Sequence, residues 1–285
     1  MSNRRIGIDQ RGDSLLIATT VDESGRTTVL RLDRLHPSEL NGVALVPEDS
    51  IALAVPDSQV MVKMVRVNPA GSISQSDRIR FELLQSVLEN EDTFHFDSVP
   101  TGSADRRLGL IFRRQHISEL TDRLGLRAAL RENRLSFQSR AVALGKGYLT
   151  FGLEQNDPLI VLVDLAGDAA SICFIYERRV ADVASLSLSG HDLSGEPGLR
   201  RFAVDLKTII NYKQSMLLDA GISVPPARVL LSGEFLSDTV RDAVQSHFSV
   251  EVAGTRLNEG FFGALDSATR DSLPLYAAAL GLTVN

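Results

Sequence analysis

The feature that most constrains this chain is a short acidic motif that occurs twice, about half a chain apart. The motif reads Asp-x-x-Gly-Asp, at residues 9–13 and again at residues 164–168. Each copy closes a short apolar run, at residues 6–8 or 159–163, and two β-type stretches follow it. Alternating apolar and β-branched residues favour strands. The repeat therefore predicts two similar halves, each beginning with three strands, that face each other.

Composition and charge exclude several classes of protein. A chain of 285 residues can bury a substantial core, as one large domain or as two. Its net charge of −6 argues against a dedicated nucleic-acid binder, which needs a basic face. No apolar run approaches the roughly 20 residues that a membrane-spanning helix needs. The N-terminus leads straight into a predicted strand, so we expect no signal peptide and a cytoplasmic protein.

Between and after the two motifs, hydrophobic periodicity predicts an alternation of strands and helices. In the first half we expect strands at 51–55, 60–67, 94–99 and 108–112, and helices at 77–88, 115–124 and 138–149. In the second half we expect strands at 228–231 and 250–252, and helices at 199–218, 235–247 and 273–282. This order predicts an α/β fold in which extra elements interrupt the first half.

Six segments occur in an order that is typical of one family. They are Ile6-Gly7-Ile8-Asp9; residues 78–83 followed by 94–99; residues 108–113 with 117–126; residues 207–212; residues 229–233; and residues 276–282. Together they resemble the actin-like ATPase superfamily and, more narrowly, the PilM family of type IV pilus assembly, which is related to FtsA and to the cytoplasmic part of GspL. The resemblance covers nearly the whole chain.

The resemblance implies an α/β fold of two duplicated actin-like (ribonuclease H-like) halves with a small inserted α+β subdomain. On this division, the first actin-like subdomain comprises residues 1–75 and 138–157. The insert comprises residues 76–137, and the second actin-like half comprises residues 158–285.

The resemblance also implies a nucleotide cleft that would hold ATP and Mg²⁺ between the two halves. The residues that would bind the nucleotide are Asp9, Gly12, Asp164, Gly167, Lys207 and Gly233, with Asp9 and Asp164 as the Mg²⁺ ligands. Carboxylate oxygens are the ligands that this hard cation prefers. Glycine in each turn would let backbone N–H groups approach phosphate oxygens.

All three nucleotide motifs depart from the family pattern. Each turn has an extra residue before its glycine and an aspartate after it, so Asp13 and Asp168 would lie near a polyphosphate. A carboxylate about 4 Å from a phosphate charge costs roughly 1 kcal/mol in water and about 4 kcal/mol at an effective dielectric near 20. Glu234 replaces a second glycine at the adenosine turn. A metal or Arg11 could offset part of this repulsion, and the cleft is therefore interpreted as degenerate.

Each nucleotide residue also has a simpler explanation. The side chains of Asp9 and Asp164 can close turns without any ligand, and Lys207 can be a solvated lysine on a helix face. Dispersed histidines show no metal-ligand spacing, and no residue stands out as catalytic.

The resemblance implies a protein partner as well. PilM binds the cytoplasmic tail of the inner-membrane protein PilN in a cleft between the first actin-like subdomain and the insert. In this chain, the residues expected to line that cleft are Arg78, Phe81, Glu82, Phe94, Phe96 and Leu110. The family's proline near the end of the first inserted helix is absent here, so the preferred tail can differ.

Three functional hypotheses follow. The first is a cytoplasmic scaffold of a type IV pilus or type II secretion-like machine, held at the inner face of the inner membrane through a PilN-like partner, with a degenerate nucleotide cleft. The second is a genuine ATP-binding, weakly hydrolysing actin-like protein. The third is a small-molecule kinase of the same superfamily, for which no catalytic base is evident. The first is preferred, and a homo-oligomer is compatible with it.

Overall fold

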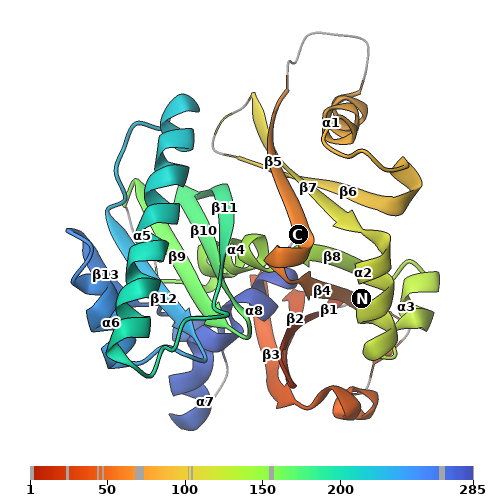
Figure 1. Ribbon diagram of the computed structural model, residues 1–285. Coiled ribbons are helices and arrows are strands. Elements are labelled where there is room, and N and C mark those ends of the chain that lie inside the picture. Colours follow the sequence, from red (N-terminus) through yellow and green to blue (C-terminus); the bar gives the residue numbers. More distant parts are fainter. Residues whose placement is uncertain are drawn as a thin grey trace.

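In the computed structural model, the structure describes residues 3–23, 26–43, 45–46, 48–67, 74–101, 103, 105–153, 157–262 and 267–284. These residues form two five-stranded sheets and one three-stranded sheet (Figure 1). The two larger sheets lie in separate halves of the chain, and the smaller one stands beside the first half.

The two five-stranded sheets have the same topology. The first has the order β3-β2-β1-β4-β8, with β1 (Asn3–Arg11), β2 (Ser14–Glu23), β3 (Arg26–Leu35), β4 (Ser50–Val55) and β8 (Leu135–Ser139). The second has the order β11-β10-β9-β12-β13, with β9 (Leu159–Ala166), β10 (Ala169–Tyr176), β11 (Arg179–Ser187), β12 (Arg228–Gly233) and β13 (Glu251–Gly254). In each sheet the first three strands pair antiparallel and the last two join in parallel. The predicted duplication is confirmed.

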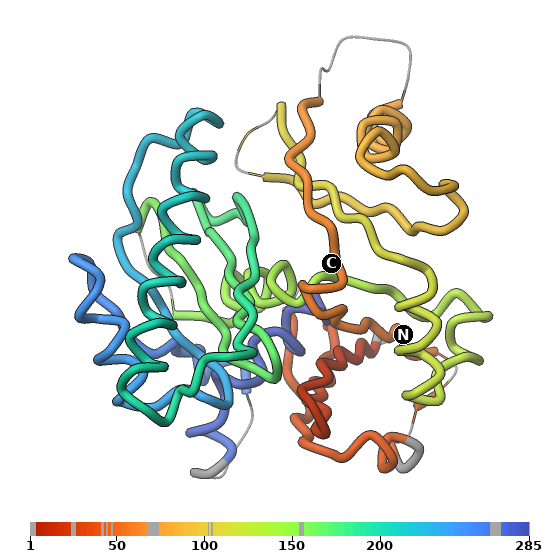
Figure 2. The backbone as a smooth tube through the Cα atoms, viewed as in Figure 1, coloured from red at the N-terminus to blue at the C-terminus, as the bar shows by residue number. Residues whose placement is uncertain are grey.

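Two helices pack between the halves. α4 (Arg140–Phe151) packs on β10 and β11 of the second sheet, whereas α8 (Ala277–Leu282) packs on β1 and β2 of the first. The helices approach each other so closely that a Cβ atom on Gly281 would lie 1.7 Å from the carbonyl oxygen of Ala143. Figure 2 shows how the C-terminal segment returns to the N-terminal strands. The resulting apolar core is shared by both halves.

The outer face of the second sheet is covered by α5 (Glu196–Asp219), which contacts α6 (Asp238–Gln245). Phe202, Leu206 and Ile210 of α5 are buried against the sheet. Gly221 follows the helix with a φ of +87°, a conformation that suits glycine at a helix end. A short helix, α7 (Ser267–Ser272), precedes α8.

The insert is built on a sheet of order β5-β7-β6, formed by β5 (Val60–Arg66), β6 (Phe94–Pro100) and β7 (Arg106–Arg113). α1 (Gln75–Leu84) packs on one face, while α2 (Arg114–Arg123) and α3 (Arg127–Arg131) follow β7 in the chain. Because β5 pairs with β7, the sheet of the insert starts at Val60 and not after residue 75. β8 pairs with β4, so the first half resumes at Leu135. Sequence periodicity identifies strands but not their pairing. The three-stranded sheet therefore begins earlier in the chain than the expected insert of residues 76–137 does, and the return to the first sheet comes before the expected end of that insert.

Several predicted helices differ in length from the observed ones. The helix predicted at 77–88 ends at Leu84, and the side chain of Leu88 is fully exposed. The helix predicted at 235–247 is shorter because the Ser237 hydroxyl accepts a hydrogen bond from Val240 N and starts α6 there. The predicted C-terminal helix at 273–282 divides into a 3₁₀ turn (Leu273–Tyr276) and α8.

Candidate functional site

Each acidic motif forms a tight hairpin turn between two strands. β1 and β2 pair as far as Arg11 and Ser14, and β9 and β10 pair as far as Ala166 and Ala169. Each loop is therefore two residues long, with its glycine first. Gly12 has a φ of +53° and Gly167 a φ of +64°, and glycine first in a two-residue loop is typical of a type II′ turn. The aspartate after each glycine is exposed.

The tips of the two turns lie near each other. A Cβ atom built on Gly167 would lie 3.8 Å from the backbone nitrogen of Gly12. Both turns line one cavity of about 300 Å³, together with Arg11 and Arg140. The duplicated turns therefore face each other at the interface of the halves.

Asp9 and Asp164 occupy equivalent positions at the ends of β1 and β9, and both are completely buried. Arg11 lies two residues after Asp9, so strand alternation places the two side chains on the same face. The Arg11 Nε donates to Asp9 Oδ2 at 2.8 Å, and its Nη2 lies 2.8 Å from Asp164 Oδ2. One guanidinium thus bridges the carboxylates of both halves. The second motif has only Ala166 at the position of Arg11.

Arg140 completes a charge cluster of Asp9, Arg11, Arg140 and Asp164, and the hydroxyl of Ser232 adds a hydrogen bond to it. The Nε of Arg140, at the first position of α4, donates to Asp9 Oδ1 at 2.8 Å. The Ser232 hydroxyl, on β12, donates to Asp164 Oδ1 at 3.0 Å. The cluster contains two carboxylates and two guanidinium groups, so its buried charges balance.

The cluster shifts the ionisation of its members. Burial alone would raise the pKa of Asp9, but Arg140 and Arg11 outweigh that effect and hold its pKa below the ordinary value. Burial would lower the pKa of Arg11, but Asp164 and Asp9 raise it instead. Asp9 therefore stays ionised despite complete burial, because its counter-charges lie within hydrogen-bonding distance.

The start of α4 is held by a second buried carboxylate, Asp57. Its Oδ1 accepts hydrogen bonds from the Ser139 hydroxyl and from Ala141 N, on either side of Arg140. Burial raises the pKa of Asp57. These contacts fix the backbone from which Arg140 reaches Asp9.

The residues of the charge cluster do not fit a hydrated Mg²⁺ ion with a polyphosphate. Both oxygens of Asp9 bind guanidinium groups, and the carboxylate of Asp164 contacts Arg11 and Ser232. Among the described residues, no group of three or more His, Cys, Asp or Glu side chains could hold a metal ion. In this arrangement the protein's own cation takes the carboxylates that an oxygen-seeking metal would need.

Gly233 and Lys207, which were also expected to contact nucleotide, lie in different surroundings. Gly233 has a φ of +111° and lies so close to β9 that a Cβ atom there would be 2.2 Å from Leu165 O. Glu234 forms an ion pair with Arg34 of the first half at 2.8 Å. Lys207 is exposed on α5 and is not part of the charge cluster. Of the six residues expected to contact nucleotide, the structure brings Asp9, Gly12, Asp164 and Gly167 together at the interface of the halves.

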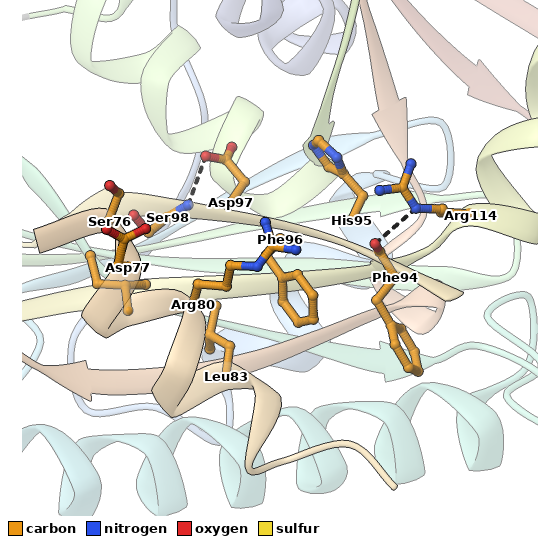
Figure 3. Close-up of a pocket in the computed structure, with 11 residues that line it drawn as sticks. Ser76, Asp77, Arg80, Leu83, Phe94, His95, Phe96, Asp97, Ser98 and Arg114 are labelled. Atoms are coloured by element: carbon orange, nitrogen blue, oxygen red, sulfur yellow. Dashed lines mark hydrogen bonds between the residues drawn. The ribbon is translucent and has the colours of Figure 1, made fainter. Parts of the chain in front are cut away.

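A second candidate site is a cavity of about 380 Å³ in the insert, between α1 and β6. Phe94 and Phe96, which were predicted to line a partner cleft, line this cavity, together with Arg80, His95, Asp97 and Arg114 (Figure 3). Arg78, Phe81 and Glu82 lie on α1 but do not line this cavity, and Phe81 is exposed. Leu110 is completely buried in the core and cannot contact a partner in this conformation.

One edge of β6 faces this cavity. β6 is an outer strand of its sheet, and the pairing with β7 uses its other edge. Phe94 O accepts a hydrogen bond from Arg114 Nε at 3.0 Å, and Ser98 N donates to Asp97 Oδ1 at 2.7 Å. Backbone groups of alternate residues point the same way in a strand, so those of Phe96 also point to this edge. His95, Asp97 and Arg114 were not anticipated, because alternation alone does not show which strand lies at an edge.

The duplicated sheets, the paired helices between them and the meeting hairpin turns define an actin-like fold. No family model and no curated protein sequence matches this chain. Solved structures share the fold, among them the cytoplasmic domain of EpsL from Vibrio cholerae, an inner-membrane component of the type II secretion system. That domain has a TM-score of 0.50 and 10% identity over 97% of this chain and 94% of its own. A Bacteroides thetaiotaomicron protein with an actin-like ATPase fold has a TM-score of 0.50 and 9% identity, over 88% of this chain and 90% of its own.

The likeness to PilM is stronger. A PilM–PilN type IV pilus biogenesis complex matches with a TM-score of 0.65 and 13% identity, over 98% of this chain and 97% of the other. At this identity the match establishes the fold, and the resemblance expected from the sequence is confirmed at that level. None of the described helices is long and apolar enough to cross a membrane.

Proposed function

We propose that this chain is a non-catalytic, actin-like scaffold of a type IV pilus or type II secretion-like machine. It binds the cytoplasmic tail of an inner-membrane partner and thereby sits at the inner face of that membrane. Its nucleotide cleft is degenerate, so partner binding requires no ATP. The similarity to PilM in a PilM–PilN complex, and to the cytoplasmic domain of EpsL, supports this proposal.

The observation that carries the proposal is the outer edge of β6, with which no described strand pairs and which lies beside a cavity. An extended peptide can add to such an edge through main-chain hydrogen bonds, while pockets beside the strand select alternate side chains. The backbone of Phe96 offers one N–H and one C=O between the positions that Arg114 and Asp97 already occupy. The cavity beside this edge is lined by both charges and rings, which suits an amphipathic tail.

Side chains around the outer edge of β6 hinder its pairing with strands of other proteins. Asp97 and Arg114 take backbone groups at either end of the strand, and Arg80 lies 5.8 Å from the ring centroid of Phe96. Charged side chains at a sheet edge discourage pairing with other sheets. The edge is therefore available to a short segment but protected from a whole strand.

Peptide titration against two variants at one position tests the proposal. The probe is a fluorescent peptide with the sequence of the cytoplasmic tail of a PilN-like membrane protein. Phe96→Ala removes the ring, whereas Phe96→Pro removes the ring and the N–H that points to the outer edge. Proline is tolerated at such edge positions, so both variants keep the sheet.

We expect saturable binding to the wild type without nucleotide. Phe96→Pro should bind about fivefold more weakly than Phe96→Ala, since a net hydrogen bond contributes about 1 kcal/mol and about 1.4 kcal/mol corresponds to a factor of ten. Arg31→Glu, on the distant strand β3, serves as the control and should bind as the wild type does. Equal affinities of the two Phe96 variants would contradict edge pairing, and no binding to the wild type would contradict the proposed partner.

A further inference from the structure

The charge cluster at the centre of the molecule joins residues that are far apart in sequence. Asp9 and Arg11 come from β1, Arg140 from the start of α4, and Asp164 from β9 of the other half. The side chains of Asp9, Arg11 and Asp164 have no exposed surface, and that of Arg140 is 4% exposed. Desolvating four charges is costly, so a cluster of this kind is stable only when its groups are mutually paired.

We propose that Arg11 is a resident cation, which holds the two halves of the protein closed in place of a bound metal ion. Its guanidinium contacts Asp9 on its own half and Asp164 on the other, at 2.8 Å in both cases. The halves are therefore joined by a covalently attached positive charge that cannot dissociate. This inference concerns the interface of the halves and does not depend on the partner cleft in the insert.

The geometry assigns distinct tasks to the two arginines. Arg140 contacts Asp9 and the carbonyl oxygen of Gln10, both on the first half, so it positions the end of β1. Arg11 is the member of the cluster whose guanidinium pairs with carboxylates of both halves. Removal of Arg140 perturbs one half, whereas removal of Arg11 leaves carboxylates on both sides of the interface without their shared counter-charge.

A second bridge lies nearer the surface. Arg34 of β3 pairs with Glu234, which follows β12, at 2.8 Å. Arg34 is half exposed, so solvent screens this pair and its contribution to closure is small. The buried bridge through Arg11 is therefore the stronger of the two.

Removal of the resident cation has a specific chemical consequence. Without Arg11, the carboxylates of Asp9 and Asp164 and the hydroxyl of Ser232 remain at the interface as oxygen ligands. Hard divalent cations bind such oxygen ligands. Because Arg140 still pairs with Asp9, the cluster then holds two carboxylates and one guanidinium, and this net negative charge favours cation binding. An Arg11→Ala variant should therefore acquire a dependence on Mg²⁺ or Mn²⁺ that the wild type lacks.

The test is thermal unfolding of the purified protein with and without about 10 mM MgCl₂ or MnCl₂, at an ionic strength matched with NaCl. We expect no cation effect on the wild type. Arg11→Ala should unfold about 5–10 °C lower than the wild type, and either cation should restore at least half of that loss. The double variant Arg11→Ala, Asp164→Ala lacks one ligand and should show no restoration.

Arg31→Ala is the matched control, because Arg31 is 65% exposed on β3 and pairs with Asp33, two positions further along the same strand. If Arg11→Ala yields too little folded protein, Arg11→Gln keeps the length of the side chain without its charge and is measured in the same way. The proposal is overturned if the Arg11 variant unfolds at the temperature of Arg31→Ala. It is also overturned if neither cation restores stability, or if the double variant responds equally.

Discussion

Arg11 and Asp164 are separated by 153 positions in the sequence, yet their charged groups meet at 2.8 Å in the interior of the protein. Each residue belongs to one copy of the same duplicated motif. The contact therefore joins the two halves at the ends of their first strands. It also places a guanidinium between the carboxylates of Asp9 and Asp164, where it can hold the halves together without a nucleotide.

Arg140 should contribute strongly to stability. Arg140→Met keeps much of the buried volume but removes the charge that pairs with Asp9 at 2.8 Å. Breaking one partner of a buried ion pair costs about 3–5 kcal/mol, and we expect a loss of that size in the free energy of unfolding by urea. Arg31→Met, at an exposed position, should change it by less than about 0.5 kcal/mol. Similar losses in the two variants would show that the cluster is not a paired unit.

Acid should weaken the cluster through Asp9. The pKa of Asp9 in the folded protein lies below the unfolded value of 3.8, so the unfolded chain takes up the proton first as the pH falls. The stabilisation is complete well above pH 3.8 and is lost as the pH falls through the folded-state pKa. We expect Asp9→Asn to have a smaller free energy of unfolding by urea than the wild type at pH 7. The difference in this free energy should narrow below about pH 4. A difference that stays constant from pH 7 to pH 3 would contradict this coupling.

The close contact of α4 and α8 should not tolerate a single methyl group. In Gly281→Ala, the new Cβ would lie 1.7 Å from Ala143 O and 2.6 Å from Gly147 N, both backbone atoms that cannot rotate away. Such overpacking costs about 1–3 kcal/mol or more, measured by chemical unfolding. Gly254→Ala is the control, because its Cβ would have no neighbour within 4 Å, and it should be nearly neutral. Equal stability of both variants would show that the helices can separate without cost.

Much of the fold could be predicted from the sequence, because it is encoded in local patterns. The duplicated motif and the strands around it reflect period-two alternation and glycine turns, and β9 begins at Leu159 as predicted. By contrast, β8 and α3 are five residues each and too short for a periodic signal. The assignment of β5 to the insert depends on pairing with β7, which no local pattern reveals.

The candidate site was predictable only in part, for the same physical reason. The two aspartates were evident because each ends an apolar strand before a glycine turn. Arg11 was visible beside them, but its contact with Asp164 depends on how the halves face each other. Arg140 reaches Asp9 across 131 positions, and its sequence signal is only a charged residue at the start of an apolar helix. Long-range ion pairs of this kind become visible only in three dimensions.

Calorimetric titration of Mg-ATP into the wild-type protein tests whether the guanidinium of Arg11 replaces a nucleotide-bound metal ion. We expect no heat of binding up to millimolar nucleotide from a folded protein, because Arg11 already pairs with both carboxylates. Micromolar binding that is lost in an Asp9→Ala, Asp164→Ala double variant would contradict this expectation. It would mean that the guanidinium moves aside and that the cleft is a working nucleotide site.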